Sequence, residues 1–445
     1  MRVFTDGFAG ELIDPGDEGY DAARVVWNGM IDRRPAMIVR PTGAADVITA
    51  VHFARTEDLR IAVRSGGHSI PGLSTCDDGI VIDLSRMRNV RVDPENRTAH
   101  VSGGALLGDL DHEAQAFGLV CPVGVISHTG AAGLTLGGGM GRLQRKFGLT
   151  IDNLLSADVV TADGRLVHAS EDQNPELFWG LRGAGPNFGI VTSLEYRLHT
   201  LGRVITHGSV LEPIDRVNEL AALFRDAVEN GPDELGLGFG LGLAESSGDP
   251  VAFVNVLHCG SLADAERDLA TLRSFEPSAG SIEAKPYLTT QTMNDGAMDW
   301  GQRFYMKSAL LVDLPDDLID RLAGRLPEIP ARAYGEFSVW AMGRAVAAVP
   351  EDATAYAGRE ATYWLAAEIL WHDDALDDVC REWVRDAIAD VQPYATTGRY
   401  VNDVADTGED VVRSVYGNAK YEKLVELKRA WDPDNVFRLN QNIRP

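Results

Sequence analysis

The sequence predicts an α+β protein in which an antiparallel sheet, covered by helices, forms the middle section. Two observations stand out: the first suggests backbone packed closely against a ligand, and the second predicts the fold class. Glycine is concentrated in one window, with twelve glycines in residues 101–150 against four in the fifty residues before it. From about residue 204 the pattern changes to a mixture of strands and helices that suits an antiparallel sheet with helices on one face. The length of 445 residues predicts about two or three domains, at roughly 150 residues each.

The first two hundred residues read as short strands with turns between them. The Asp163-Gly164 pair is a strong hairpin signal between two apolar segments. Apolar residues at helical spacing (Leu107, Leu110 and Ala114) mark one face of a helix. Strands are predicted at 60–64, 80–84, 98–102, 155–161, 165–168 and 189–198.

The middle and the end of the chain have different patterns. The predicted elements are strand 204–210, helix 213–229, strands 235–243 and 251–258, helix 262–274, and a last helix Tyr421–Trp431. These changes in the pattern of strands and helices divide the chain into three predicted segments: residues 1–203, residues 204–398 and residues 399–445.

Composition and charge exclude several classes of protein. Lys plus Arg is 41 and Asp plus Glu is 66, so the net charge is −25, which opposes binding to nucleic acid or to an anionic membrane. The four cysteines include no CxxC pair, so we expect neither a disulfide framework nor a metal site. No run of eighteen apolar residues occurs, and charge appears within Met1–Asp6. We therefore expect a cytoplasmic protein.

Common catalytic motifs are missing. No GxGxxG occurs, because Gly183–Phe188 breaks that pattern at its last position. A Gly-Lys pair, an HExxH and a GxSxG are also missing. The sequence therefore does not favour an ordinary Rossmann site, P-loop phosphotransfer, zinc proteolysis or α/β-hydrolase chemistry.

The segment Ser65-Gly66-Gly67-His68 follows a predicted strand. Small residues there can form a concave run of backbone N–H groups that holds a diphosphate without a positive side chain. Alternatively, the segment is a plain turn and His68 is a surface histidine. The glycine-rich segment fifty to seventy residues later favours the first interpretation, because two such loops suggest a long dinucleotide between them.

These segments resemble a known family. Arg64–Ser69, Gly124–Gly141 and Gly183–Thr192 are similar to the PCMH-type FAD-binding domain of the vanillyl-alcohol-oxidase superfamily. The C-terminal Tyr416–Asn440 resembles the berberine-bridge-enzyme-like branch. Trp27–Ala36 is most similar to the enterocin-pathway favorskiiase group, as is the run Ser127–Gly130. The resemblance implies a PCMH-type FAD-binding domain, completed by residues 399–445, and a substrate domain between its two parts.

The resemblance also implies a flavin bound through His68, whose neutral imidazole nitrogen can attack the flavin methyl carbon. Cys121 could form a second link as a thioether, or it could be a small buried cysteine beside the flavin. The resemblance implies a cofactor site made of Arg64, Ser65, Gly66, Gly67, His68, Ser69, Cys121, Pro122, Gly124, Ser127, His128, Gly130, Gly133, Gly138, Gly189, Ile190, Val191, Asn440 and Asn442.

Tyr416 and Thr129 are the predicted catalytic residues. Tyr416 would act as general base, although the usual tyrosine pKa near 10 requires a cation or a hydrogen bond to lower it. It could equally be a packed tyrosine. Thr129 would lie on the oxygen-reactive side of the flavin, or it is a turn residue. His128 is expected to be structural rather than catalytic.

The predicted function is an FAD-dependent oxidase in which a small organic substrate passes a hydride to covalent flavin and O2 accepts the electrons, giving H2O2. The favorskiiase likeness suggests a flavin-N5-oxide oxygenase of polyketide-like substrates instead. A flavin-binding protein without turnover is the third reading. Expected partners are a small molecule and O2, with the protein a monomer or homodimer.

Overall fold

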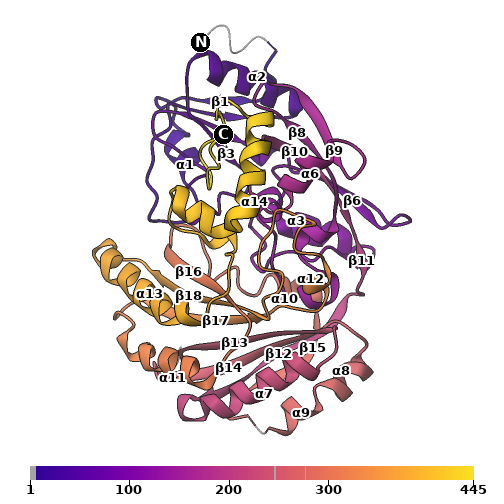
Figure 1. Cartoon of the computed structure of the whole chain (residues 1–445), viewed down its shortest axis with the longest axis vertical. Coiled ribbons are helices and arrows are strands. Elements are labelled where there is room, and N and C mark those ends of the chain that lie inside the picture. The colour runs from indigo at the N-terminus through magenta and orange to yellow at the C-terminus, as the bar shows by residue number, and fades with distance from the viewer. Residues whose placement is uncertain (1–6, 245–246, 276) are drawn as a thin grey trace.

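The computed structural model describes residues 7–244, 247–275 and 277–445. The chain forms two lobes, one above the other in Figure 1. The first lobe contains residues 7–203 together with residues 399–445, and the second lobe contains residues 204–398. Residues 1–6, on which the prediction about the N-terminus depends, lie outside the described residues. Within the described residues, no helix has both the length and the apolar composition needed to cross a bilayer.

Two sheets make up most of the first lobe. In the four-stranded sheet, ordered β1-β2-β4-β3, the pairs β2–β4 and β3–β4 are parallel. Its strands are β1 (Glu11–Ile13), β2 (Met37–Arg40), β3 (Ile61–Arg64) and β4 (Ile80–Asp83). The five-stranded antiparallel sheet, ordered β5-β6-β10-β8-β9, contains β5 (Val90–Asp93), β6 (Thr98–Ser102), β8 (Leu154–Val160), β9 (Leu166–Ser170) and β10 (Ile190–Arg197). The short strands β7 (Leu119–Val120) and β11 (His199–Thr200) pair separately.

The hairpin predicted around Asp163-Gly164 is confirmed. Strands β8 and β9 pair antiparallel on either side of it. Gly164 has φ +79°, a left-handed conformation that glycine adopts without steric cost.

Within the described residues, seven α-helices belong to the first lobe. They are α1 (Tyr20–Arg24), α2 (Ala44–Thr56), α3 (Leu107–Gln115), α4 (Ala131–Leu136), α5 (Gln144–Phe147), α6 (Pro175–Leu181) and α14 (Glu409–Trp431). Helix α14 starts twelve residues before the predicted helix, because a first segment joins it across a kink at Gly417 (φ +70°). The C-terminal residues then run back to the four-stranded sheet, where Phe437 packs with Met37 and Ile61.

A seven-stranded antiparallel sheet dominates the second lobe, in the order β15-β12-β14-β13-β17-β18-β16. Its strands are β12 (Val204–Pro213), β13 (Leu235–Leu243), β14 (Pro250–His258), β15 (Ala279–Pro286), β16 (Arg303–Leu311), β17 (Tyr334–Ala341) and β18 (Tyr363–Trp371). Below it in Figure 1 lie α7 (Val217–Asn230), α8 (Leu262–Asp268), α9 (Ala270–Ser274) and α11 (Asp316–Arg325), and α13 (Asp377–Val391) lies at the left beside β18. Helices α10 (Tyr287–Gln291) and α12 (Ala345–Ala348) lie between the lobes. The predicted α+β class is confirmed.

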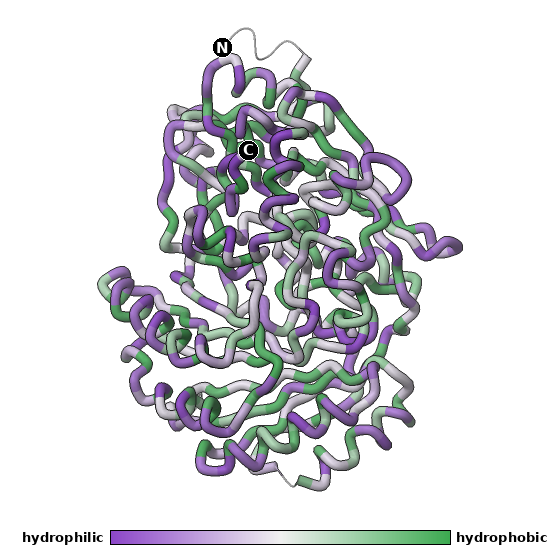
Figure 2. The backbone as a smooth tube through the Cα atoms, in the orientation of Figure 1, coloured by the Kyte–Doolittle hydropathy of each residue, from purple (hydrophilic) through white to green (hydrophobic). Residues whose placement is uncertain are grey.

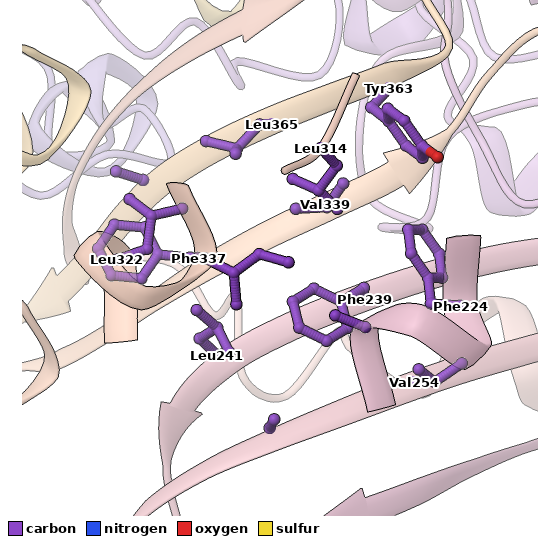
Figure 3. Packing of buried hydrophobic residues seen from close by; sticks show 14 of the residues in the cluster. Phe224, Phe239, Leu241, Val254, Leu314, Leu322, Phe337, Val339, Tyr363 and Leu365 are labelled. Carbon is purple, nitrogen blue, oxygen red and sulfur yellow. The ribbon is translucent and has the colours of Figure 1, made fainter. Parts of the chain in front are cut away.

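Alternation along the strands separates the two faces of this sheet. Phe337 and Val339 of β17 point toward the helices and pack with Phe224 of α7 and Phe239 of β13 (Figure 3). The apolar strands and the more hydrophilic covering helices are visible in Figure 2. The intervening side chains of β17 must therefore face the first lobe, where Trp340 packs with residues of both lobes. The face of the sheet that is turned toward the first lobe can therefore carry a functional site.

Candidate functional site

A cavity in the first lobe brings together the loop after β3, the turn before α4, the start of β10 and the C-terminal tail. These segments lie far apart in the sequence. The predicted site residues that line the cavity are Ser65, Gly66, Gly67, His68, Ser69, Thr129, Gly130, Gly133, Gly189, Ile190, Val191 and Asn440.

Two of the cavity loops pack backbone against backbone. A Cβ atom on Gly66 would lie 2.1 Å from the backbone nitrogen of Gly130, and a Cβ on Gly130 would lie 2.3 Å from that of Gly66. Neither backbone can move aside without separating the loops. Gly67 adopts φ +72°, which turns the chain within this segment. The two glycine-rich segments therefore meet directly, without intervening side chains.

His68 is held at the cavity wall by neighbours on two sides. Its ring stacks on Trp27 with centroids 4.8 Å apart and an interplanar angle of 15°. Its Nε2 lies 2.7 Å from Nδ1 of His128. Burial, reinforced by His128, lowers the pKa of His68 to about 3. The imidazole is therefore neutral at physiological pH, which is the state a nucleophilic ring nitrogen requires.

Four buried polar oxygens of the cavity lining have no hydrogen-bond partner within the described chain. They are Ser65 Oγ, Ser74 Oγ, Asn440 Oδ1 and Gln441 Oε1. The amide nitrogens of the last two residues are already used: Asn440 donates to Pro186 O, and Gln441 donates to Val404 O. Since buried polar atoms are normally paired, the cavity is suited to a large ligand that carries hydrogen-bond donors.

A second group of polar side chains lies on the face of the large sheet that is turned toward the first lobe. Glu336 and Glu368 are directly opposite each other on β17 and β18. Ser338 Oγ lies 2.7 Å from Oε1 of each carboxyl group. A hydroxyl has only one hydrogen to donate, so both contacts are hydrogen bonds only when one of the two carboxyl groups is protonated.

The electrostatics of this pair agree with its geometry. Burial raises the pKa of Glu336, and burial together with Glu336 raises that of Glu368. Like charges this close cannot both be ionised at low cost, so the pair holds one proton over a wide pH range. We call Glu336, Ser338 and Glu368 the carboxyl cluster.

Asp403 lies near both the carboxyl cluster and the cavity, and its charge is one of the causes that raise the pKa of Glu368. Its neighbour Asn402 lines the cavity, and its own Oδ2 accepts hydrogen bonds from Trp364 Nε1 (2.7 Å) and Ser308 Oγ (3.0 Å). Burial raises the pKa of Asp403 to about 7. The acidic side chains of both lobes thus meet at the interface.

Comparison with known proteins identifies the family. A family described as "FAD binding domain" matches residues 35–170, and one described as "Berberine and berberine like" matches residues 399–444. The chain is 34% identical to (R)-6-hydroxynicotine oxidase of Paenarthrobacter nicotinovorans over 98% of this chain and 97% of that protein. The chain belongs to the berberine-bridge-like family of FAD-linked oxidoreductases. It is also 31% identical to an FAD-linked oxidoreductase of Dictyostelium discoideum, over 100% and 97% of the two chains.

Solved structures agree with this assignment. 6-Hydroxy-D-nicotine oxidase from Arthrobacter nicotinovorans superposes with a TM-score of 0.88 at 31% identity, covering 99% of this chain and 98% of that one. Berberine bridge enzyme from Eschscholzia californica has the same fold, with a TM-score of 0.88 at 21% identity over 100% and 98%. The chain is therefore an FAD-dependent enzyme, and the four unpaired oxygens of the cavity fit a cofactor with imide and hydroxyl donors.

In this berberine-bridge-like enzyme, not every residue that was predicted to bind the cofactor lies in the cavity wall. Arg64, predicted to bind the cofactor, is buried, and its guanidinium donates to Asp83 Oδ2 (2.8 Å) and to Val25 O (3.0 Å). A buried arginine that already has a carboxylate partner is not free for a phosphate. In this structure Arg64 fixes the base of the loop that carries His68.

Cys121 is buried in the core of the first lobe and is not part of the cavity wall. Burial and the nearby Asp111 raise the pKa of its thiol well above the usual value. Because the thiolate is the reactive form of cysteine, these surroundings disfavour a thioether. A second flavin link stays a prediction without geometric support.

The loop around Cys121 is held by contacts within and between the lobes. Pro122 O accepts from Thr150 Oγ1 at 2.7 Å, and a Cβ on Gly124 would lie 2.8 Å from a side-chain carbon of Leu134. Ser127 binds Asp295 of the second lobe through both its backbone N–H (2.8 Å) and its hydroxyl. Pro122, Gly124 and Ser127, which were predicted to bind the cofactor, therefore hold this loop in place and do not line the cavity.

Three further predicted residues differ from the expected arrangement. Gly138 (φ +133°) packs against the ring of Tyr356, outside the cavity wall. Asn442 also lies outside this wall, with its Oδ1 unpaired. Tyr416 is buried in the core of the first lobe, its hydroxyl has no partner, and burial raises its pKa. No cation lowers that pKa, so its role as base stays a prediction that the surroundings do not favour.

The carboxyl cluster was not predicted from the sequence. The alternating apolar residues Phe337 and Val339 do indicate one buried face of a strand. The polar residues that alternate with them, Glu336 and Ser338, are the available signal for the opposite face. Their pairing with Glu368 depends on which strands are neighbours, and the sequence does not show that.

Proposed function

We propose that the enzyme oxidises a small amine by hydride transfer to FAD attached to His68, with O2 as the electron acceptor and H2O2 as product. FAD, when bound, supplies the two-electron acceptor. The proposal divides the chain into a flavin domain, residues 1–203 with 399–445, and a substrate domain, residues 204–398. The observation that carries the choice of an amine is the carboxyl cluster, which faces the flavin lobe and holds a single proton.

The carboxyl cluster suits an amine for an electrostatic reason. An ionised carboxylate accepts hydrogen bonds and a proton, whereas an amine donates both. The protonated carboxyl group is linked through Ser338 to the ionised carboxylate and keeps it in place. The carboxyl cluster therefore carries a single negative charge. The name (R)-6-hydroxynicotine oxidase, borne by a relative that is 34% identical, also refers to a nitrogenous substrate.

Attachment through His68 is supported by the direction in which its ring is held. Nε2 is used by His128, so Nδ1 is the nitrogen that remains for a bond to the flavin methyl carbon. The stack on Trp27 fixes the ring plane. We expect acid-precipitated protein to stay yellow and its mass to exceed that of the chain by one FAD, whereas His68→Ala should give a colourless pellet. A colourless wild-type pellet would contradict the attachment.

The oxidase reaction is tested by two measurements on the yellow protein. Mixing with candidate amines under anaerobic conditions should bleach the absorbance near 450 nm, and admitting air should restore it with one H2O2 per turnover in a peroxidase-coupled assay. Alcohols with the same carbon skeleton are the matched control. If alcohols bleach the colour and amines do not, the amine assignment is wrong.

An oxygenase remains the second candidate, because the segments Trp27–Ala36 and Ser127–Gly130 resemble the favorskiiase group and Thr129 lines the cavity. Turnover under ¹⁸O2 distinguishes the two reactions. Label in the organic product supports the oxygenase, and label only in H2O2 supports the oxidase.

A further inference from the structure

A second cavity lies between the lobes, separate from the one that contains His68. Its walls come from the loop before α5, from strands β12, β13, β14 and β17, and from the segment after α10, which lies between the lobes in Figure 1. On β17 it reaches Trp340, four residues from Glu336, or about 14 Å along the strand.

Positive and neutral polar groups line this cavity in a protein of net charge −25. Among the described lining residues are Arg142, Arg145 and His207, with no aspartate or glutamate. Arg145 donates to the carbonyls of Val228 and Met342, so it belongs to the wall. Arg142 is therefore the cation that is left for a ligand.

Arg142 has no ion-pair partner within the described chain, and its one side-chain contact is a 3.3 Å hydrogen bond to Gln291. Burial lowers the pKa of its guanidinium to about 10. The charges of Asp111 and Asp295 favour the charged form of Arg142, but within the described chain neither carboxylate lies at ion-pair distance from its guanidinium. A half-buried cation without a direct ion-pair partner carries a desolvation cost that an anion would offset.

His207 gives an independent indication of a ligand. It is only 5% exposed, it lines the cavity, and its Nδ1 has no hydrogen-bond partner among the residues that the structure describes. Its pKa is lowered to about 4 by burial, then by Arg142 and Lys285, so the ring is neutral and can donate one hydrogen bond. Buried side-chain nitrogens without partners are rare, and each one needs an explanation.

The shape of the cavity sets the kind of ligand. Gly238 of β13 leaves open space, because a Cβ there would have only ordinary contacts, at 3.6 Å to Val339 O and 3.9 Å to Asn255 Cβ. Trp340 and Met293 supply apolar surface beside the polar end. We propose that this cavity binds a small organic carboxylate, with its charge on Arg142 and His207 and its apolar body against Trp340.

Calorimetric titration of the purified yellow protein with sodium benzoate tests this proposal, with benzyl alcohol as the neutral probe of the same size and NaCl to match ionic strength. We expect saturable binding of benzoate and none of benzyl alcohol. Arg142→Gln should weaken binding about tenfold, the effect of losing a charged hydrogen bond.

Gly238→Val provides a variant that keeps every charge and fills the open space with a residue that strands favour. It should also weaken benzoate binding, whereas Arg91→Gln, at an exposed arginine of β5, should leave it unchanged. Equal binding of benzyl alcohol, no binding of benzoate to the wild type, or wild-type affinity in both Arg142→Gln and Gly238→Val would overturn the proposal. None of these results depends on whether the enzyme oxidises amines.

Discussion

At the scale of single residues, the roles of the titratable groups follow from what surrounds them. His68 is neutral because it is buried beside a second imidazole. The pKa of Tyr416 is raised because burial disfavours the charged phenolate. Glu336 and Glu368 share one hydroxyl and keep a proton between them. Of these groups, the carboxyl pair is the best placed to accept a proton near neutral pH.

This assignment predicts a specific pH profile. A base must be ionised, so kcat/KM should rise with pH through the raised pKa of the pair and then level off. Glu336→Gln removes the neighbouring charge that raises the pKa of Glu368, so the rising limb should move to lower pH by about one pH unit.

Within the pair, Glu368 is the candidate base, because its pKa is raised to about 8 and its ionised form therefore takes up a proton readily. Substitution of Glu368 distinguishes a carboxylate base from a tyrosine base. Glu368→Gln should lower kcat/KM by about a hundredfold, the usual effect of removing a general base. Tyr416→Phe, which deletes one buried oxygen, should leave the reaction unchanged. If Tyr416→Phe causes the large loss and Glu368→Gln does not, the tyrosine is the base.

At the scale of elements, the glycines position the cofactor segments. The loop after β3 and the turn before α4 meet through Gly66 and Gly130, with no space for a side chain between their backbones. The tail that follows helix α14 lines the same cavity. The buried Lys428 of α14 pairs with Asp432 at 2.7 Å and donates to Phe437 O at 2.9 Å, which holds the tail in place.

Gly66→Ala should therefore separate the two loops. Its Cβ would meet the backbone rather than a flexible side chain, so we expect a lower melting temperature and little bound flavin. Gly324→Ala is the matched control, because nothing lies within 4 Å of a Cβ at that helical position. It should raise the free energy of unfolding by up to about 1 kcal/mol. Flavin content and differential scanning fluorimetry measure both effects, and normal flavin loading of Gly66→Ala would contradict this account.

At the scale of the whole molecule, function depends on how the two lobes meet. Asp111 of α3 lies at that interface, where Gln291 Nε2 donates to its Oδ2 at 3.1 Å while Oδ1 has no partner. Burial raises the pKa of Asp111 to about 7, from an ordinary value of 3.8. The folded protein therefore keeps this proton over a pH range in which the unfolded chain loses it.

The sign of the resulting pH dependence follows from linkage. Between about pH 4 and pH 7 the folded state binds more protons at Asp111 than the unfolded state, so this group's contribution to stability falls as pH rises. Asp111→Asn removes the titration. Relative to the wild type, its free energy of unfolding should increase with pH by up to about 1.4 kcal/mol per pH unit in this range. Urea unfolding at pH 5 and pH 7.5 measures the difference, and a difference that does not change with pH would contradict the raised pKa.

Much of the cofactor site could be predicted from the sequence because its parts are local. Ser65–Ser69 is one continuous loop, and the glycines near residue 130 form one turn, so residue type alone indicated backbone that approaches a ligand closely. The family resemblance also implied that Arg64 and Cys121 belong to the cofactor site, and the sequence could not show what surrounds either side chain. The structure shows that a buried carboxylate engages Arg64 and that Cys121 lies in the core.

The sequence by itself determined the class of the fold, the two glycine segments and the histidine between a strand and a turn, because each depends on residues within a few positions of one another. Only the tertiary structure decided that Glu336 faces Glu368, that Tyr416 is buried in the core, and that Arg142 lacks an acidic partner. These facts depend on strand order and on the contact between lobes, where residues separated by tens to hundreds of positions determine one another's charge.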